Sequence, residues 1–385
     1  MGCTGAWRIG SRPCDSKIQK SKTELTGIDK NRFGEENRLS PPSPDKLTGL
    51  RILVTGGAGF VGSEVTAQLC QQGSMVTVLD DFSSGKIEYV SSHEGVKIVE
   101  GDVCDRDKVA DIVKDQEIVV HLAALPFIPD SYYYPEEFFS VNTMGSVNIV
   151  WQCIQSKSVE RFVQISSSEV YGTALYEPMD EKHPTLPHST YAVSKLAADR
   201  AIFTMHKEHG YPVVIIRPFN SYGPRVTQPY IIPEIASQLL GGCGILVLGN
   251  VDAVRDFTYV EDTARAIILA STQKKAVGET INVGTGQGVS IRDLAILMAK
   301  ILGSEVGIHI DESRIRPFDV HRLICDFSKA REILNWSPTI PLEEGLRITL
   351  DWLSAHPVSY KGPFAGWPRV YRSTERRNDR RTATG

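Results

Sequence analysis

Apolar runs alternate with helical segments along the middle of the chain. The runs at 51–56, 75–80 and 117–124 (RILVTG, MVTVLD and EIVVHLAA) are continuous, as expected for strands that helices cover on both faces. EVTAQLCQQG (64–73) and STYAVSKLAADRAIFTMHKEHG (189–210) have helical spacing. Strands that alternate with helices predict a parallel sheet built from right-handed crossovers. We therefore expect an α/β fold with a doubly wound parallel sheet.

The pattern continues to about residue 220 and then changes. After Asn220 turn residues become frequent, and helical spacing returns at 291–302 and 342–354. We expect this part to form a smaller mixed domain that closes over the edge of the sheet. Further strands are predicted at 97–102, 161–167 and 212–220, and a further helix at 142–155.

The two ends of the chain differ in composition from its middle. Residues 1–48 are polar and end in SPPSPDK, and the last twenty-five or so are rich in arginine. Such stretches favour solvated backbone over packing. The predicted organisation is a disordered leader at 1–48, the sheet domain at 49–220 with about 256–283, the smaller domain at 221–255 and 284–354, and a flexible basic tail at 355–385.

The overall composition excludes several classes of partner. The 385 residues are 41% hydrophobic and 23% charged, enough for a large core, and the net charge of −4 provides no basic field for nucleic acid. No apolar stretch reaches the ~20 residues that a membrane span needs. After the start MGC, Ala6 occupies the place where a myristoylation signal needs Ser or Thr. We expect no nucleic-acid partner and no membrane anchor.

Cysteine and histidine usage points away from disulfides and metals. The seven cysteines are an odd number, widely spaced and without a CxxC pair, so neither a disulfide framework nor a zinc site is indicated. His206 and His209 are three apart but have no third ligand in range, so no metal is predicted. A reducing cytoplasm is the expected location.

The sequence TGGAGFVG at 55–62 joins an apolar run to a helix. Side chains at Gly56 and Gly59 would keep the backbone away from a pyrophosphate, and one at Gly62 would push the helix from the strand. The free amides at the start of the helix can then hold the anion. Glycine patterns also occur in tight structural turns, but the place between strand and helix favours a dinucleotide site.

Carboxylates close the next two predicted strands. Asp80 ends the second strand, where it can accept both ribose hydroxyls of adenosine and would repel a 2′-phosphate. Asp81 follows it, with no arginine nearby, and Asp102 ends the third strand, where it can face the adenine ring. The alternative is that Asp80 is a turn residue. We predict NAD rather than NADP as the cofactor.

Tyr191 and Lys195 are four residues apart in a strongly helical stretch, so they project from one face. A phenol with a pKa of about 10 is a poor base near pH 7, and lowering that pKa by three units requires about 4 kcal/mol. One cation at ~4 Å and an effective dielectric of ~20 supplies about that much. We therefore expect Lys195 to lower the pKa of Tyr191. A pair of surface residues is the alternative for this spacing alone.

Five motifs together resemble one known family. TGGAGFVG, the strand-end Asp80, SSSEVYG at 166–172, YAVSK at 191–195 and RPFNSYGP at 217–224 resemble the nucleotide-sugar epimerase and dehydratase branch of the extended short-chain dehydrogenases/reductases. The resemblance covers roughly residues 50–352. It implies a Rossmann domain that binds NAD, a smaller domain that binds a nucleoside-diphosphate sugar, and a homodimer that pairs through helices near 145–155 and 192–206.

The resemblance also implies roles for individual residues. Ser167 would hydrogen-bond the 4-hydroxyl of the sugar, Tyr191 would remove its proton, and Lys195 would bind the nicotinamide ribose. The implied cofactor-binding residues are Gly56, Gly59, Phe60, Val61, Gly62, Asp80, Asp81, Phe82, Ser84, Asp102, Val103, Leu122, Ala123, Ala124, Ser166, Tyr191, Lys195 and Pro218. The implied substrate-binding residues are Asn142, Asn220, Arg255, Asn282 and Arg316. The sequence reads RPFD after Ile315, where relatives commonly read RPGD.

A glutamate follows the serines of the SSSEVYG motif. Glu169 resembles the glutamate of nucleotide-sugar 4,6-dehydratases, which oxidise C4, remove the C5 proton and lose water from C6; simple 4-epimerases have small residues there. Ketone formation at C4 acidifies the C5 proton, so a carboxylate can remove it. Ser168 stands where some dehydratases have an aspartic acid, so Glu169 would serve as both base and acid.

Several functions remain open at this point. The first is a nucleotide-sugar 4,6-dehydratase. A UDP-glucuronate decarboxylase uses the same oxidation at C4 and shares the Ser-Glu pair, and in a 4-epimerase Glu169 would be a bystander. A non-catalytic NAD(H) sensor is a different class, but it would have no use for Ser167, Tyr191 and Lys195 together.

Overall fold

The computed structural model describes residues 47–316 and 318–356. The predicted leader, apart from its last two residues, lies outside this part of the chain. So do the MGC start and the predicted basic tail, apart from its first two residues.

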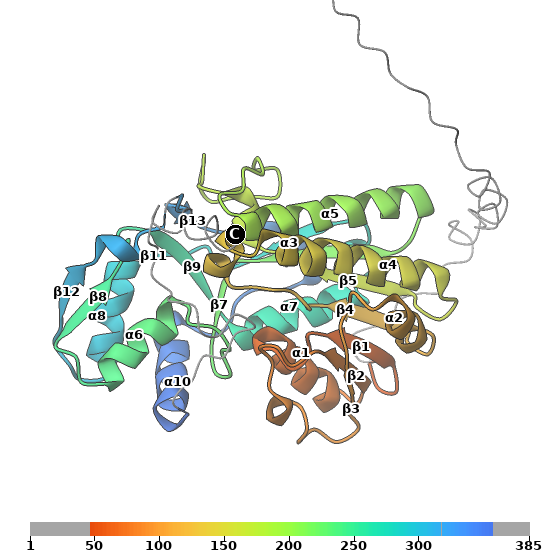
Figure 1. Ribbon diagram of the computed structural model, residues 1–385, viewed down its shortest axis with the longest axis horizontal. Helices are drawn as coiled ribbons and strands as arrows, with labels where there is room; N and C mark the ends of the chain where they lie inside the picture. The colour runs from red at the N-terminus through yellow and green to blue at the C-terminus, as the bar shows by residue number, and fades with distance from the viewer. Residues whose placement is uncertain (1–46, 317, 357–385) are drawn as a thin grey trace, which may run out of the picture. The chain divides into compact units, whose positions relative to one another are not determined.

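A seven-stranded parallel sheet forms the centre of the structure (Figure 1). Its strand order is β3-β2-β1-β4-β5-β6-β10, and every neighbouring pair is parallel. This is the doubly wound Rossmann topology, in which the order reverses between β1 and β4. The strands are β1 (Arg51–Thr55), β2 (Met75–Asp80), β3 (Lys97–Glu100), β4 (Ile118–His121), β5 (Arg161–Ile165), β6 (Val213–Pro218) and β10 (Thr280–Val283).

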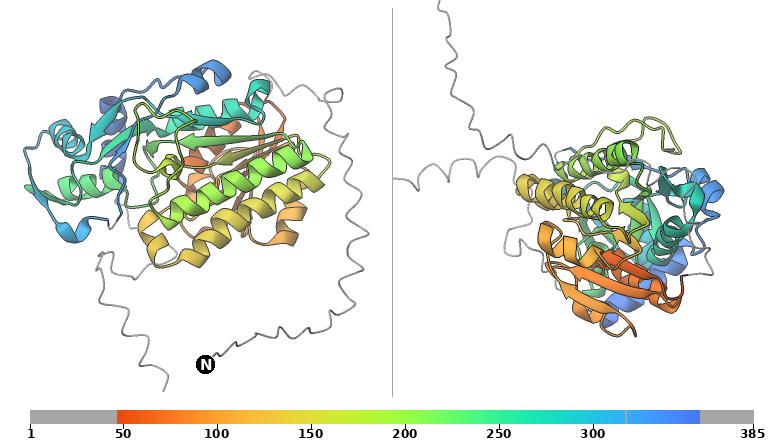
Figure 2. Two further views of the ribbon diagram at one scale, coloured as in Figure 1. Left: turned by 90° about the horizontal axis from the view of Figure 1, so that it is seen from above. Right: turned by 90° about the vertical axis from the view of Figure 1, so that its right-hand side faces the viewer.

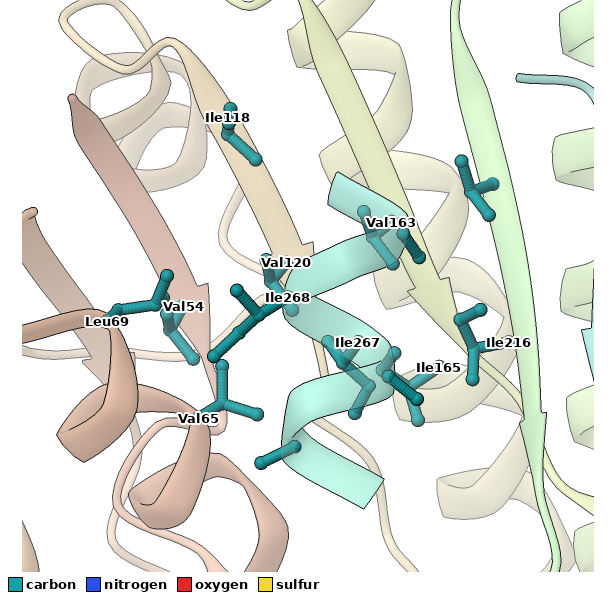
Figure 3. Close-up of a cluster of buried hydrophobic side chains, with 14 of the residues drawn as sticks. Val54, Val65, Leu69, Ile118, Val120, Val163, Ile165, Ile216, Ile267 and Ile268 are labelled. Carbon is teal, nitrogen blue, oxygen red and sulfur yellow. The ribbon is translucent and has the colours of Figure 1, made fainter. Parts of the chain in front are cut away.

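Helices cover both faces of this sheet, as the continuous apolar runs predict. On one face, α1 (Phe60–Gln71) and α7 (Val260–Thr272) pack side by side, and their apolar side chains meet those of the strands in one core (Figure 3). The other face is covered by α2 (Arg106–Val113), α4 (Ser146–Gln155) and α5 (Thr190–His209), of which α4 and α5 lie alongside each other (Figures 1 and 2).

The ends of α5 follow from local sequence. The Ser189 hydroxyl accepts a hydrogen bond from the backbone N–H of Ala192 at 3.1 Å and caps the first turn. Gly210 ends the helix in the left-handed conformation, with φ +65°. These two signals place Tyr191 in the first turn of α5, next to the carboxyl ends of the strands.

The later part of the chain forms two smaller sheets with a core of their own. In one, β9 (Val254–Tyr259) pairs with β7 (Asn220–Tyr222), β11 (Gly288–Ser290) and β13 (Arg322–Leu323); in the other, β8 (Ile245–Leu248) pairs with β12 (Gly307–Ile310). Three helices pack around these sheets through apolar faces: α6 (Ile231–Leu240), α8 (Ile291–Ile301) and α10 (Leu342–Ala355). Helix α9 (Ser328–Leu334) packs against β10 and α7. The domain boundaries expected from the sequence remain a prediction.

Two predicted elements are divided in the structure. The helix expected at 142–155 begins as a π-helix, η8 (Phe139–Gly145), which follows α3 (Pro135–Phe138) and continues as α4. The strand expected at 212–220 is split into β6, in the main sheet, and β7, in the second sheet. Phe219 separates them, and its N–H donates to Val283 O at 2.8 Å.

Helices long and apolar enough to cross a membrane do not occur among the described residues. The five cysteines in this part of the chain are free thiols. His206 Nδ1 donates a 2.7 Å hydrogen bond to Tyr211 O, and the His209 ring packs on Trp151 with its centroid 5.7 Å away, so both rings have structural partners.

Candidate active site

A cavity of about 700 Å³ lies at the carboxyl ends of the main-sheet strands. Five residues that end or follow successive strands line it: Gly56 after β1, Asp80 of β2, Leu122 after β4, Ser166 after β5 and Pro218 of β6. This is the switch-point position at which doubly wound sheets bind ligands. The two smaller sheets contribute the other wall: one through β9, and the other through the loop after β8 and the segment that follows β12.

The glycine turn forms the part of the cavity expected to hold a pyrophosphate. Gly56 has φ +67°, and a Cβ there would lie 2.7 Å from the N atom of Ala123. A Cβ at Gly62 would collide with the carbonyl oxygen of Gly56, whereas one at Gly59 would meet only that oxygen at 3.2 Å. Gly56 and Gly62 are therefore required by the turn itself. Gly59 caps α1 without a side chain and leaves its N-terminus open toward the cavity.

The predicted adenosine-binding carboxylates lie on the same cavity. Asp80 Oδ2 accepts a hydrogen bond from Ala58 N–H, and Oδ1 accepts one from Phe82 N–H, both at 2.9 Å. These bonds fix the carboxylate, whose pKa burial raises and which lines the cavity. Asp81, Ser84, Asp102 and Val103 also line the cavity.

Phe82 does not line the cavity, contrary to the prediction. It has φ +55°, and its ring packs against the hydrophobic core beneath the sheet. The positive φ turns the side chain away from the ligand side of the loop. The other predicted cofactor residues, from Phe60 and Val61 to Ala123 and Ala124, do line the cavity.

The catalytic candidates come together from two elements. Ser167 caps the short helix η9 (Ser168–Tyr171), where its hydroxyl accepts from Glu169 N–H at 3.2 Å. Tyr191 and Lys195 reach the same cavity from α5. The ammonium group of Lys195 donates to Ile165 O, at the end of β5, at 2.6 Å. The predicted triad of serine, tyrosine and lysine is therefore assembled on one wall.

The pKa of Tyr191 differs from the prediction. This pKa is raised to about 12, chiefly by burial and with help from the charges of Glu169 and Asp199, while the hydrogen bond with the Ser167 hydroxyl acts to lower it. Burial also lowers the pKa of Lys195 to about 8, against the charge of Asp199. The sequence argument counted the attraction of a cation but omitted the desolvation of a buried phenolate, which is the larger effect here.

Glu169 is the carboxylate nearest to the chemistry. It is 8% exposed, lines the cavity, and its charge acts on both Tyr191 and Arg255. Ser168, beside it, also lines the cavity but is buried to 3% exposure. A nearly buried carboxylate therefore lies on the cavity wall within electrostatic reach of both Tyr191 and Arg255.

The two predicted phosphate-binding arginines share an aspartate that the sequence prediction missed. Arg255 lies 3.6 Å from Asp319 and donates to Val320 O at 2.7 Å, while Arg316 lies 3.9 Å from the same carboxylate. Asn250 donates to Asp319 at 2.9 Å. Both arginines, Asn250 and Asp319 line the cavity. The motif RIRPFD contains this aspartate, so its spacing from Arg316 was the available signal.

Asn142 and Asn282 do not line the cavity, which corrects their predicted contacts. The Asn142 amide accepts from Leu125 N–H at 2.7 Å and donates to Leu125 O at 3.1 Å. The Asn282 amide accepts from the Tyr171 hydroxyl at 2.8 Å and donates to Met179 O at 3.1 Å. Both asparagines are fully buried and hold loops that surround the site. Asn220, in contrast, does line the cavity.

An aromatic pair forms another wall that the sequence analysis did not assign. Phe127, in the loop after β4, lies 6.2 Å from Tyr230, at the start of α6, measured between ring centroids. Both rings line the cavity, and the charge of Tyr191 acts on Tyr230. These side chains give the cavity an apolar surface suited to the face of a sugar ring.

Comparison with known proteins agrees with this site. Residues 53–349 match the model of the family "GDP-mannose 4,6 dehydratase". The chain is 32% identical over 315 residues to dTDP-glucose 4,6-dehydratase of Streptomyces niveus, covering 79% of this chain and 92% of the relative. It is 31% identical to UDP-glucuronic acid decarboxylase 1 of Xenopus tropicalis, covering 78% and 72%.

A solved structure shows the same fold with the expected cofactor. UDP-glucose 4-epimerase of Thermus thermophilus, in complex with NAD, superposes with a TM-score of 0.73 at 31% identity, covering 80% of this chain and all of that one. The fold and the site thus define an extended short-chain dehydrogenase/reductase of the NAD-dependent epimerase/dehydratase type. Within that class the chain belongs to the GDP-mannose 4,6-dehydratase family. The family predicted from the motifs is confirmed.

Proposed function

We propose that this protein is an NAD-dependent nucleotide-sugar 4,6-dehydratase. The carrying observation is Glu169, a carboxylate on the cavity wall whose charge acts on both Tyr191 and Arg255. A dehydratase needs such a group because the C5 proton must leave after C4 is oxidised. Relatives named as dTDP-glucose 4,6-dehydratases from Streptomyces and from mammals support this reaction.

The residues on the cavity fit NAD. The glycine turn at Gly56 and Gly59 lines the cavity at the open N-terminus of α1, where a pyrophosphate would bind, and the carboxylate of Asp80 stands where the adenosine ribose would bind. Leu122, Ala123 and Ala124 would line the nicotinamide side. When bound, NAD supplies the hydride acceptor for C4 and the hydride donor for C6.

The chain's own residues would manage the protons. The Ser167 hydroxyl would orient the 4-hydroxyl of the sugar, and Tyr191 would take its proton as the C4 hydride leaves. Glu169 would then take the C5 proton and give a proton to the C6 hydroxyl, which departs as water. The hydride taken from C4 then goes to C6, and the proton taken from the 4-hydroxyl goes to C5, so the net change is the loss of one water. The proton transfers thus rest on two groups, Tyr191 and Glu169.

The phosphate end of the substrate would be held by the second sheet. Asn220, Arg255 and Arg316 line that wall, and the planar guanidinium groups suit a diphosphate. Asp319 orients both arginines. We infer that the protein binds a nucleoside-diphosphate sugar across the cavity, with the sugar toward Tyr191.

The proposal is tested by incubating the protein with UDP-, dTDP- and GDP-sugars and measuring the masses of the products. Loss of water supports it. For a substrate that reacts, Glu169→Gln is expected to lower dehydration at least about 100-fold while still forming NADH, because C4 oxidation needs only Tyr191. Tyr191→Phe should abolish both. Glu332→Gln, an exposed glutamate on α9, serves as the control. Full dehydration by Glu169→Gln contradicts the assignment.

Decarboxylation of a UDP-uronate is the second candidate. It shares the oxidation at C4, and the Arg255 guanidinium, on which the charge of Glu169 acts, is a candidate partner for a C6 carboxylate. A UDP-glucuronic acid decarboxylase is among the relatives. Loss of carbon dioxide in the same mass assay distinguishes this reaction. Unchanged mass with an altered sugar would show an epimerase, and no turnover of any sugar would favour an NAD(H) sensor.

We also propose that the protein forms a homodimer through α4 and α5, as the family resemblance predicted. Val193, at 40% exposure, and Met144, at 59%, place apolar surface on this side of the sheet. Apolar side chains of this kind gain free energy when a partner covers them. Light scattering after gel filtration gives the mass, and a charge introduced by Val193→Glu should shift it toward the monomer.

A further inference from the structure

His188 joins the start of the catalytic helix to the wall that carries the two arginines. It directly precedes Ser189, the N-cap of α5, and lies three residues before Tyr191. Its ring stacks on the ring of Phe318, with the centroids 3.8 Å apart and an angle of 14° between the planes. His188 Nδ1 also donates to Asp319 O at 3.2 Å, because a carbonyl oxygen can only accept. No step of the proposed chemistry uses these contacts.

The stack is not explained by burial of the phenylalanine. Phe318 is 59% exposed, so most of its surface remains in water and little free energy comes from covering it. The ring of His188 also lies beside Gly172, the C-cap of η9, where an added Cβ would be 3.0 Å from His188 Cδ2. The histidine therefore contacts the end of η9, the short helix that carries Glu169, as well as Phe318.

Asp319 connects these contacts to the predicted diphosphate site. Its carboxylate lies 3.6 Å from Arg255 and 3.9 Å from Arg316, and it accepts from Asn250 at 2.9 Å. These four residues form the proposed diphosphate wall. The backbone carbonyl of Asp319 accepts from His188. One residue thus touches the arginines through its side chain and the start of the catalytic helix through its backbone.

We propose that His188 is a positioning residue that, together with Phe318, sets the spacing between the diphosphate wall and Tyr191. A sugar nucleotide held by its diphosphate would then present C4 of the sugar to the phenol at a fixed distance. A misplacement of about 1 Å in such an arrangement can lower a rate by about two orders of magnitude. The inference rests on the proposed function for the identity of the ligand, but its central test requires no turnover.

The central test is amide hydrogen exchange of the full-length protein, read by mass spectrometry with and without UDP, dTDP or GDP. These probes carry the diphosphate without the sugar. In the wild type, the nucleotide that binds should slow exchange at least about threefold in the wall segment 250–256 and in 189–195, which contains the Ala192 and Val193 amides bonded to Ser189. In His188→Ala and Phe318→Ala, protection should remain in 250–256 and be lost in 189–195.

A matched control comes from a second stacked histidine. The ring of His356 stacks on Trp352, with the centroids 4.6 Å apart, and its Nδ1 donates to Trp352 O at 2.9 Å, but neither residue lines the cavity. His356→Ala should therefore keep both protected segments. Phe318→Tyr retains the aromatic face and should also behave as the wild type. Because Phe318 is largely exposed, Phe318→Ala serves as the test even if His188→Ala does not fold.

With a sugar nucleotide that reacts, NADH formed in a single turnover gives a second readout. C4 oxidation should fall about tenfold in His188→Ala and in Phe318→Ala, while the affinity for the nucleoside diphosphate stays within about twofold, because the wall itself is intact. The double variant should lose no more than either single variant, since both remove the same contact. A merely structural role would lower rate and binding together, in proportion to the unfolded fraction.

The outcomes separate this inference from the proposed function. Protection of 189–195 that persists in both single variants overturns the inference and leaves the proposed function intact. The same holds if the wild type is protected only in 250–256. Coupled protection in a protein that turns over no sugar nucleotide supports the inference and contradicts the dehydratase. Absence of binding by all three nucleotides overturns both.

Discussion

Tyr191 shows how strongly burial sets the starting state of a catalytic residue. Its pKa of about 12 leaves almost none of the phenolate at pH 7 to 8 when the protein is free of ligand. In the proposed reaction, the phenolate of Tyr191 would therefore have to form with substrate and cofactor in the cavity, where added positive charge would lower its pKa.

His121 gives a pH-dependent prediction for stability. It is buried at the end of β4, where Nδ1 lies 2.6 Å from Thr55 Oγ1 and Nε2 lies 3.0 Å from Ser146 Oγ. Burial and the charge of Lys195 lower its pKa to about 3. The unfolded chain binds a proton below about pH 6.5 and the folded chain does not, so stability falls as pH drops from 6.5 toward 3.

The measurement is the free energy of unfolding in urea at several pH values. For one histidine, the wild type should lose up to about 1.4 kcal/mol for each pH unit well below 6.5. His121→Gln should remove that part of the slope, although it costs stability at pH 7. His356→Gln, at an exposed position after α10, is the control and should keep the wild-type slope. Equal slopes in wild type and His121→Gln would contradict the assignment.

At the scale of elements, the π-helix η8 determines how the loop after β4 approaches the cavity. The wider turn of η8 places the buried Asn142 side chain against Leu125, and its amide also donates to Ser194 on α5 at 3.0 Å. The loop at 125–129, which lines the cavity, is thereby tied to the catalytic helix. π-bulges within helices often occur at functional sites in this way.

Asn142→Ala is expected to destabilise the protein by about 2 kcal/mol or more, because Leu125 N–H and C=O would lose their partners in a buried place. Urea unfolding measures the loss. NADH affinity should fall as well, because the residues proposed to line the nicotinamide side, 122–124, directly precede this loop and would shift with it. Ser140→Ala, exposed on the same π-helix, is expected to stay within about 0.5 kcal/mol of the wild type. A stability loss no larger than that of Ser140→Ala would argue against this role.

Predictions from the sequence were most accurate where local steric or hydrophobic requirements allow few conformations. The central strands, the glycine turn and the order of the motifs follow from continuous apolar runs and from steric needs at Gly56 and Gly62. The predictions failed for polar side chains that can bind either a ligand or another part of the protein. Asn142 and Asn282 have the chemistry of ligand-binding residues, but backbone groups from distant segments take their hydrogen bonds. Partners 17 and 103 residues away in sequence leave no local pattern.

At the scale of the whole molecule, an ion pair joins the main sheet's α1 to the loop that follows β7. Arg225, which has φ +63°, pairs with Glu64 on α1; their side chains are 22% and 12% exposed. Val226 and Thr227, directly after Arg225, line the cavity. The pair therefore fixes this cavity-lining loop onto α1 of the main-sheet half.

Arg225→Met should lower the unfolding free energy by about 1–2 kcal/mol, because it leaves Glu64 mostly buried without its partner. The KM for the sugar nucleotide should rise more than kcat falls, since the loop loses its anchor. Arg292→Met removes an exposed pair with Asp252 and should cost less than about 0.5 kcal/mol. The double variant Glu64→Met with Arg225→Met completes a double-mutant cycle that measures the coupling free energy of the pair. If the effects of the two single variants on the unfolding free energy simply add, the pair does not anchor the loop.

The connection between β6 and β7 limits how far the main sheet and the sheet of β7 and β9 can move relative to each other. Phe219 alone separates a strand of the main sheet from a strand of the second sheet, and it is buried and hydrogen-bonded to Val283. Pro218, before it, has its φ fixed by its ring. A hinge needs residues whose backbone angles are free to change, and neither Pro218 nor Phe219 meets this requirement. We therefore expect the floor of the cavity to move little, so that a nucleotide sugar bound as proposed would enter past the segment at 311–316, which follows β12 along the cavity wall.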